Sequence, residues 1–281
     1  MDIDTKVIDG SKISSIIKEE LKKEIALGLN VGLAVIMVGD NKASEIYVRN
    51  KRKACEYIGI KSFIYKLPEE TTTGQIMELV EVLNNDNTVD GILIQLPLPN
   101  HINTDEVVQS IDKNKDVDGF CHENLGALIS GTPNFISCTP IGIIELLKRY
   151  EIPIDSQKCV IIGRSSLVGK PLSMLLLNEN ATVTICHSKT NNLYEQIKDA
   201  DIIISATGQI NLVTGDMIKK GAVIIDVGIN KDKDGKLCGD VDYASCIGAA
   251  SFITPVPGGV GPMTVAMLMK NCVTSAVRKV N

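Results

Sequence analysis

Apolar strand candidates alternate with amphipathic helices along most of this 281-residue chain. The first series opens with the uninterrupted apolar run VGLAVIMVG at 31–39 and ends with DGILIQ at 90–95. Strands that are apolar throughout and separated by helices are typical of a parallel sheet wrapped by helices. The alternation therefore predicts an α/β fold.

The alternation weakens and then resumes, which indicates two α/β domains. Between 100 and 140 a charged stretch precedes a loop rich in Gly, Ser, Thr and Pro, and EIPIDSQ at 151–157 resembles a boundary. We expect a substrate-binding catalytic domain over 1–138 plus 264–281. A Rossmann-like dinucleotide-binding domain is expected over 139–263.

Hydrophobic spacing places the individual elements. In the first domain we expect helices over 13–25, 43–58 and 76–83 and strands over 31–39, 61–67 and 90–95, with Ser11 capping the first helix. In the second we expect a helix near 141–150, then strands over 158–163, 181–186, 201–207, 222–228 and 251–256, with a helix after each of the first three strands. A closing helix from Met263 is expected to return to the first domain.

The composition limits the partners and the compartment. The chain carries a net charge of -5, which gives no support for binding to nucleic acid or to an anionic membrane. The first twenty residues have neither the basic start nor the apolar core of a signal peptide, and no apolar run approaches the roughly 18 residues of a membrane span. We therefore expect a cytoplasmic protein with no nucleic-acid partner and no membrane span.

The cysteines argue against a metal site. All 8 are scattered without a C-x-x-C pair, so a zinc knuckle or redox dithiol is not expected. Cys121 and His122 are adjacent, but neighbouring loop side chains point in different directions. We expect no bound metal.

The segment GRSSLVGKP at 163–171 follows one strand candidate and precedes a helix. A dinucleotide phosphate loop in this context needs a tight turn, a close backbone approach and a helix N-terminus aimed at the phosphates. Gly163 meets the first requirement, Ser165 occupies the usual position of the second glycine, and Gly169 comes one residue late. The alternative is a glycine turn that binds no ligand.

The residues after the next strand favour NADP over NAD. An NAD enzyme usually has an acidic residue about 20 residues further on, for the ribose 2′-hydroxyl. Here TICHSKT at 184–190 contains no carboxylate, and the next one is Glu195. Ser188 and Lys189, together with Arg164, would instead suit a 2′-phosphate.

One cation shares the apolar side of the helix expected over 43–58. At about 100° per residue, an arc of roughly 120° contains Ala43, Ser44, Tyr47, Lys51, Ala54, Cys55 and Ile58. Lys51 either packs its stem while its ammonium reaches water, or is buried enough to act as a base near neutral pH. The helix by itself favours the first alternative.

Five motifs, in this order along the chain, resemble those of a known enzyme family. They are YVxxK at 47–51, DGxxxQLPLP at 90–99, KDVDGF at 115–120, GRS at 163–165 and PVPGGVGPMT at 255–264. The chain resembles the bacterial bifunctional methylenetetrahydrofolate dehydrogenases and methenyltetrahydrofolate cyclohydrolases. Each motif alone is a modest signal, but together they are specific and cover nearly the whole chain.

The resemblance implies two linked reactions in one-carbon metabolism. Hydride passes from 5,10-methylenetetrahydrofolate to NADP, and the resulting 5,10-methenyl cation is hydrolysed to 10-formyltetrahydrofolate. Hydride transfer requires the two reacting carbons to be held together, so the two domains are expected to face each other across a cleft. The resemblance also implies a homodimer.

The matching motifs carry expected roles in the substrate site. Lys51 would be the acid-base group of the hydrolysis and Gln95 its hydrogen-bonding partner, while Ser44 would assist nearby. Tyr47 would stack on the aminobenzoyl ring, and Asp118 would accept hydrogen bonds from the pterin. Without the resemblance, Gln95 is a polar strand terminus, Asp118 a solvated loop acid and Ser44 an ordinary helix serine.

The remaining motifs complete the expected site. Pro257, Gly258 and Gly259 would let the backbone approach the folate or the nicotinamide, the alternative being a rigid turn before a helix. The expected cofactor-binding residues are Gly163, Arg164, Ser165, Ser188 and Ile229.

The sequence departs from the family pattern beside the expected pterin site. Cys121 and His122 stand where His-Pro is frequent, and Ser137 stands where proline is usual. Both departures concern the substrate affinity and the rigidity of this loop rather than the class of activity.

Two other functions compete with the bifunctional enzyme. A monofunctional dehydrogenase using NAD is disfavoured by Lys51 and Gln95, which suit hydrolysis, and by the cationic residues that suit NADP. A catalytically silent NADP-binding or scaffold protein would be expected to lose catalytic side chains, whereas Lys51, Gln95 and Asp118 are all present.

Overall fold

The computed structural model describes residues 3–280, which divide into two compact units. We call Ser15–Cys138 with the chain from Val265 onward the first unit, and the chain up to Ser14 with Thr139–Thr264 the second unit. The sequence predicts that the N-terminal residues belong to the first domain instead. They group with the second unit because β1 (Lys6–Val7) pairs in parallel with β11 (Phe252–Ile253).

The first unit is built on a three-stranded parallel sheet in the order β3-β2-β4. Its strands are β2 (Gly32–Val38), β3 (Lys61–Leu67) and β4 (Gly91–Ile94). Every residue of the central strand β2 is buried, which explains its uninterrupted apolar sequence.

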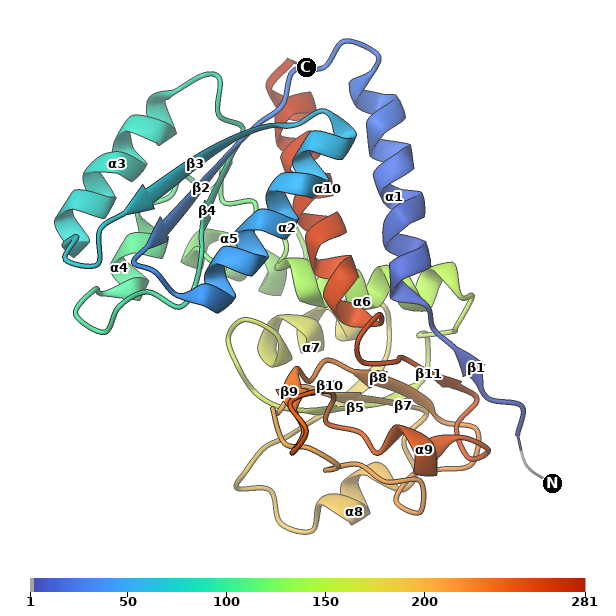
Figure 1. Ribbon diagram of the computed structural model, residues 1–281. Helices are drawn as coiled ribbons and strands as arrows, with labels where there is room; N and C mark the ends of the chain where they lie inside the picture. Colours follow the sequence, from blue (N-terminus) through green and yellow to red (C-terminus); the bar gives the residue numbers. More distant parts are fainter. Residues whose placement is uncertain (1–2, 281) are drawn as a thin grey trace. The chain divides into compact units, whose positions relative to one another are not determined.

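Helices cover both faces of this sheet. α3 (Thr73–Asn85) and α4 (Thr104–Gln109) lie on one face, and α2 (Lys42–Ile58) lies on the other with the C-terminal part of α10 (Val260–Val280) (Figure 1). On that second face the Sγ of Cys55 and the Sδ of Met269 are 3.5 Å apart. The remaining helices are α1 (Gly10–Ile25) and α5 (His122–Ile129).

The second unit contains a six-stranded parallel sheet in the order β1-β11-β8-β7-β5-β6. Its other strands are β5 (Lys158–Ile162), β6 (Thr182–Cys186), β7 (Ile202–Ser205) and β8 (Val223–Asp226). α6 (Cys138–Arg149) and α7 (Gly169–Asn178) lie on one face, and α8 (Leu193–Ile197) and α9 (Tyr243–Cys246) on the other (Figure 1).

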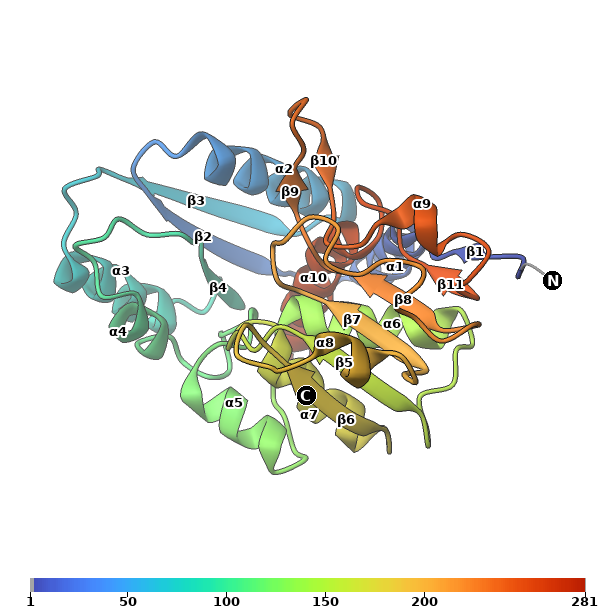
Figure 2. The ribbon, with the colours of Figure 1, turned by 90° about the horizontal axis from the view of Figure 1, so that it is seen from below.

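The chain passes from β5 to β6 on one side and then to β7 on the other side of β5. This reversal is a topological switch point, and α/β proteins bind ligands beyond the carboxyl ends of the strands at such a point. An antiparallel hairpin of β9 (Asn230–Lys231) and β10 (Leu237–Cys238) projects from the unit after β8 (Figure 2).

The strands expected from the sequence are all present, each within a few residues of its expected bounds. The helix expected between 207 and 222 is wrong, because this stretch forms turns. Gly208 and Gly221 have positive φ, which is not a helical conformation. A Cβ on Gly215 would lie 1.9 Å from the Ser245 carbonyl oxygen, so the backbone here lies too close to the segment of Ser245 to form a helix with side chains. Ser11 is also not the expected cap; the Asp9 carboxylate accepts from the N–H of Lys12 at 2.9 Å.

Candidate active site

The helix α2 presents its apolar side to the sheet, as its sequence predicts. Ser44, Ala54, Cys55 and Ile58 are buried on that side, whereas the charged residues of the opposite side are exposed. Lys51 is partly buried. The expected amphipathic helix is therefore confirmed, with one lysine at the edge of its buried side.

Lys51 contacts the glutamine that follows β4. Its Nζ donates to Gln95 Oε1 at 3.1 Å. Gln95 is only 7% exposed, its own N–H donates to the Ile36 carbonyl at 2.8 Å, and its Nε2 donates to the Leu96 carbonyl at 2.7 Å. The amide is therefore fixed at both ends, at the carboxyl edge of the sheet where α/β folds place ligand groups.

Asp118 lies close enough to Lys51 for their charges to interact. Burial raises the pKa of the Asp118 carboxyl, while the positive charge of Lys51 and a hydrogen bond from the Cys138 thiol lower it. The structure thus brings together Lys51, Gln95 and Asp118, three of the predicted site residues, from α2, the end of β4 and a separate loop.

Two further predicted residues of α2 have unused binding groups. The Ser44 side chain is 4% exposed, and its hydroxyl has no hydrogen-bond partner among the described residues. The Tyr47 side chain is 44% exposed. A ligand at this end of the sheet could pair with the hydroxyl and stack on the ring.

The loop after β5 has the close backbone approach expected of a phosphate loop. Gly163 has a φ of +126°, and a Cβ there would lie 2.4 Å from the Ala206 carbonyl oxygen. A Cβ on Gly169, the first residue of α7, would lie 2.1 Å from the Gly163 carbonyl oxygen. Only glycine fits these two positions, and the loop leads directly into the N-terminus of α7 at the switch point.

The other predicted cofactor residues follow neighbouring strands. Arg164 and Ser165 come after β5 and Ser188 after β6, and all three are exposed. Ile229 follows β8 and is 57% exposed. Since parallel strands end at the same edge of a sheet, these side chains share one edge of the second unit.

The predicted loop of Pro257, Gly258 and Gly259 also belongs to the second unit, where it contacts the start of α1. The Gly258 carbonyl accepts from the Ser11 N–H at 2.9 Å, and a Cβ on Gly10 would lie 1.8 Å from the Gly259 carbonyl oxygen. The backbone here is closely packed on one side, and the Pro257 side chain is exposed.

Two buried acids in the second unit were not predicted from the sequence. Asp240, which is 0% exposed, accepts from Ser205 Oγ, Thr207 N, Thr207 Oγ1, Gly208 N and Asn230 Nδ2 at 2.7–3.3 Å. Asp226, which is 4% exposed, accepts from the N–H groups of Gly228, Asp240 and Val241, each at 2.9 Å. These carboxylates anchor the loops after β7 and β8, and no local motif marked them.

The residues that depart from the family pattern have local roles. The N–H of Asn124 donates to Cys121 Sγ at 3.5 Å, so the thiol caps α5. The exposed His122 lies 3.6 Å from the Asp105 carboxylate. Among residues 3–280 no group of three or more His, Cys, Asp or Glu residues is arranged to hold a metal ion, and no helix is long and apolar enough to span a membrane.

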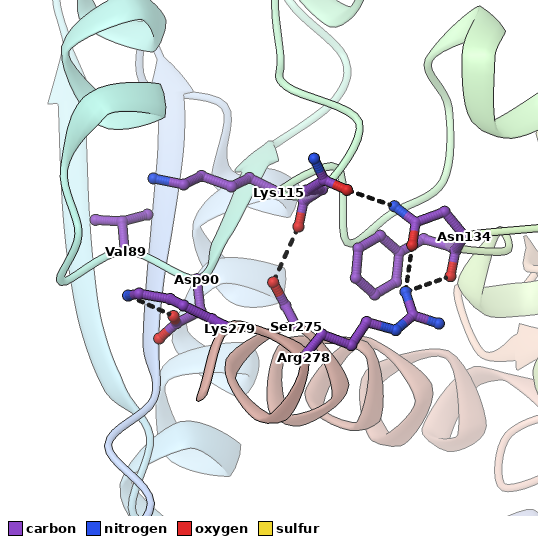
Figure 3. Close-up of a pocket in the computed structure, with 9 residues that line it drawn as sticks. Val89, Asp90, Lys115, Asn134, Ser275, Arg278 and Lys279 are labelled. Atoms are coloured by element: carbon purple, nitrogen blue, oxygen red, sulfur yellow. Dashed lines mark hydrogen bonds and ion pairs between the residues drawn. The ribbon is translucent and has the colours of Figure 1, made fainter. Parts of the chain in front are cut away.

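A separate pocket of about 240 Å³ lies in the first unit and contains none of the predicted residues (Figure 3). Its cations are held by protein oxygens: Lys279 by Asp90 and Asn87, Arg278 by Asn134, and Lys115 by two carbonyls at the end of α3. Asp90 precedes β4 whereas Gln95 follows it, so this pocket lies at the opposite end of the strand from Gln95.

The second unit has a parallel sheet with a glycine loop at its switch point, as dinucleotide-binding domains do. The first unit holds a partly buried lysine bound to a glutamine. Together these features are typical of a two-domain, dinucleotide-dependent enzyme. Residues 8–118 match the model of the tetrahydrofolate dehydrogenase/cyclohydrolase catalytic domain, and residues 137–280 match that of its NAD(P)-binding domain. The chain belongs to the tetrahydrofolate dehydrogenase/cyclohydrolase family. The family predicted from the motifs is therefore confirmed, as is the two-domain α/β fold.

Individual relatives agree with the family models. The bifunctional protein FolD of Agathobacter rectalis is 56% identical over 276 residues, covering 97% of this chain and 99% of the relative. The crystal structure of the bifunctional FolD enzyme of Campylobacter jejuni has a TM-score of 0.96 at 48% identity, covering 98% of this chain and 99% of that chain. The Trypanosoma brucei enzyme, solved with NADP cofactor and an inhibitor, has a TM-score of 0.94 at 38% identity, covering 99% of both chains.

The class of activity follows from the family. The chain is a bifunctional methylenetetrahydrofolate dehydrogenase and methenyltetrahydrofolate cyclohydrolase of one-carbon metabolism, with an NAD(P)-binding domain. It is thus both an oxidoreductase and a hydrolase, and its substrate is a folate.

Proposed function

We propose that Lys51, held by Gln95, is the acid-base group of the hydrolysis, and that Asp118 binds the pterin ring of the folate. The observation that carries this proposal is the 3.1 Å hydrogen bond from Lys51 Nζ to Gln95 Oε1 at the carboxyl edge of the first unit's sheet. The charge interaction between Lys51 and Asp118 adds a substrate-binding carboxylate beside the pair.

In the hydrolysis, Lys51 takes one proton from the attacking water, and it does so in its uncharged form, after the ammonium that interacts with Asp118 has lost a proton. The hydroxyl oxygen bonds to the methenyl carbon, the bond from that carbon to one ring nitrogen breaks, and the nitrogen receives a proton from Lys51. The hydroxyl group on that carbon loses its remaining proton as the formyl C=O forms, so the product is 10-formyltetrahydrofolate and one proton is released overall. Gln95 holds the amine during both transfers.

For the oxidation, the protein must bind the folate and hold its one-carbon bridge in place. Asp118 accepts hydrogen bonds from the pterin's amino and ring N–H groups, and Tyr47 offers its exposed ring to the aminobenzoyl group. The unpaired Ser44 hydroxyl and the loop of Pro257, Gly258 and Gly259 complete the proposed substrate contacts. Bound NADP supplies the hydride acceptor.

We propose that the second unit binds NADP rather than NAD. Gly163 and Ser165 would approach the pyrophosphate through the backbone at the N-terminus of α7, and Ile229 would contact the cofactor after β8. Arg164 and Ser188 are exposed at the ends of adjacent strands, and they would bind the 2′-phosphate. The NADP complex of the Trypanosoma brucei relative supports this choice.

Lys51→Ala tests the acid-base role. Since general acid-base catalysis contributes about 100-fold or more, hydrolysis of the methenyl substrate should fall by at least that factor, with folate and NADP binding retained. Absorbance of methenyltetrahydrofolate follows its formation and decay in one assay. Lys53→Ala, on the exposed side of the same helix, is the matched control, and retained hydrolysis in Lys51→Ala would overturn the assignment.

Arg164→Ala tests the cofactor choice. A hydrogen bond to a charged group contributes about 1.5–3 kcal/mol, so the KM for NADP should rise about 10-fold or more while the KM for NAD changes little. Lys219→Ala is the control, because Lys219 pairs with Asp201 before β7, at the opposite end of the strands. An equal loss for NADP and NAD would contradict the 2′-phosphate role.

We further propose that the enzyme is a homodimer, as the family resemblance implies, and that it is cytoplasmic. Light scattering coupled to gel filtration measures the mass directly, against 30.3 kDa for one chain. A monomer at the enzyme's working concentration would refute the dimer, and recovery in a membrane or secreted fraction would refute the location.

A further inference from the structure

The loop that carries Asp118 is fixed from within by a second aspartate. Asp116 is 1% exposed, and its carboxylate accepts from the N–H groups of Gly119, Phe120 and Cys121 at 2.8–3.2 Å. It also accepts from Asn124 Nδ2 at 2.8 Å. The backbone immediately after Asp118 therefore has little freedom, and the Asp118 side chain starts from a fixed position.

The Asp118 carboxylate is in turn contacted by the thiol of Cys138. Cys138 is the first residue of α6 and is 1% exposed. Its Sγ donates to the Val117 carbonyl oxygen, directly before Asp118, at 3.4 Å. The thiol is also close enough to the Asp118 carboxylate to lower the pKa of that carboxyl as a hydrogen-bond donor. A thiol has one proton to donate, and an ionised carboxylate is a stronger acceptor than a carbonyl oxygen. The thiol can therefore turn its proton from the Val117 carbonyl to an ionised Asp118 carboxylate.

The thiol is itself held by α10. Asn271 is 8% exposed, and its Nδ2 lies 3.8 Å from Cys138 Sγ. The same amide donates to the carbonyls of Val117 at 2.8 Å and Ile136 at 3.1 Å. Asn271 thus joins the segment before Asp118 to the segment before Cys138, which sets the separation of the thiol and the carboxylate.

The groups around Asp118 shift its pKa in opposite directions. Burial raises its pKa, and the negative charge of Asp116 acts in the same direction. Lys51 from α2 and the Cys138 thiol lower it, and Cys272 from α10 is a further neighbour. Asp118 must be ionised to accept from two donors of a pterin. Because the thiol lowers the pKa of Asp118, it favours the ionised form and therefore substrate binding.

We propose that Cys138 is a positioning residue for the folate site, whose thiol orients the Asp118 carboxylate as an acceptor for the pterin while Asn271 holds the thiol in place. This inference rests on the proposed role of Asp118. The thiol is buried and remains protonated, since burial raises the Cys138 pKa well above its ordinary value. It acts as a hydrogen-bond donor and not as a nucleophile.

Three variants test the inference. Cys138→Ala removes the donor, Cys138→Ser keeps a donor of similar size, and Cys272→Ala removes another fully buried cysteine that has no hydrogen bond to Asp118. The measurements are kcat and KM for methylenetetrahydrofolate from pH 5 to 9. Cys138→Ala should raise KM about 10-fold with a smaller change in kcat, and should move the acidic limb of kcat/KM to higher pH.

Cys138→Ser should restore most of the affinity and the wild-type pH profile, and Cys272→Ala should change neither. An unchanged acidic limb in Cys138→Ala, or a serine variant as impaired as the alanine variant, would overturn the inference. If Cys138→Ala does not fold, the infrared S–H stretch of Cys138 is measured instead, to test whether its thiol donates to Asp118. It should shift between wild type and Asp118→Asn, and an identical stretch would also overturn the inference.

Asp118→Asn separates this inference from the proposed function. Unchanged folate affinity in Asp118→Asn would refute the pterin-binding role of Asp118 itself. Lost affinity in Asp118→Asn, combined with normal kinetics in Cys138→Ala, would refute only the positioning role of Cys138.

Discussion

Removal of the Asp240 carboxylate should strongly destabilise the second unit. In Asp240→Ala, every donor that now binds Asp240 loses its acceptor. The hydroxyls of Ser205 and Thr207 can rotate to other acceptors, and the bond from Gly208 N–H is already long at 3.3 Å. The Thr207 N–H and the Asn230 amide remain. At about 1–3 kcal/mol for each buried unpaired donor, the free energy of unfolding should fall by about 2–6 kcal/mol.

Asp240→Asn is the matched variant. Its amide oxygen can replace Oδ2, the atom that binds the loop after β7, while its NH₂ group faces Asn230 Nδ2. A flip of the Asn230 amide relieves that contact, so the expected loss is only about 1 kcal/mol.

Urea unfolding followed by far-ultraviolet circular dichroism measures both losses. A loss below about 1 kcal/mol for Asp240→Ala would refute the reasoning, because it would mean that the buried donors find other partners at little cost. Equal losses for the alanine and asparagine variants would refute it as well.

Three further predictions concern separate features. Burial raises the pKa of Asp226 to about 6, so the native state binds this proton more tightly than the unfolded state, and the stability that Asp226 contributes should grow as the pH falls from about 6 toward 4. Asp226→Asn should flatten that part of the pH dependence of urea unfolding, and an unaltered slope would contradict the assignment. Lys115→Met removes two 2.8 Å bonds to carbonyls at the end of α3 and should cost about 1 kcal/mol in the same assay; no loss would show that water replaces the lysine. Gly163→Ala would place a Cβ 2.4 Å from the Ala206 carbonyl oxygen and should abolish NADP binding by calorimetry, while wild-type affinity would rule out the tight turn.

Local sequence patterns predicted the helices and strands that are long and evenly buried enough to show a clear hydrophobic pattern. The strand β2 is buried along its whole length, so its apolar run was unambiguous. The strand β1 has 2 residues and exists only because it pairs with β11, 246 positions later, so its own sequence carries no signal. The missing helix between β7 and β8 shows the opposite failure, since close backbone contacts there override the local pattern.

The candidate site divides in the same way. Lys51, Gln95 and Asp118 lie in motifs and could be named from the sequence, although only the structure shows that they meet. Cys138 and Asn271 could not be found, because a thiol and an amide acquire a role only from their neighbours. The bond between Asn271 and the Val117 carbonyl joins positions 154 residues apart.

The fixed amide of Gln95 has a consequence for the direction of proton transfer. Because its Nε2 is bound to the Leu96 carbonyl, the amide cannot turn over without setting two oxygens against each other, so only its Oε1 can face Lys51. An oxygen accepts hydrogen and repels a lone pair. When Lys51 is a neutral amine, one of its N–H groups must therefore point at Gln95, and its lone pair must point elsewhere. Gln95 therefore prevents the lone pair of Lys51 from pointing toward Gln95, so the attacking water must approach Lys51 from another direction.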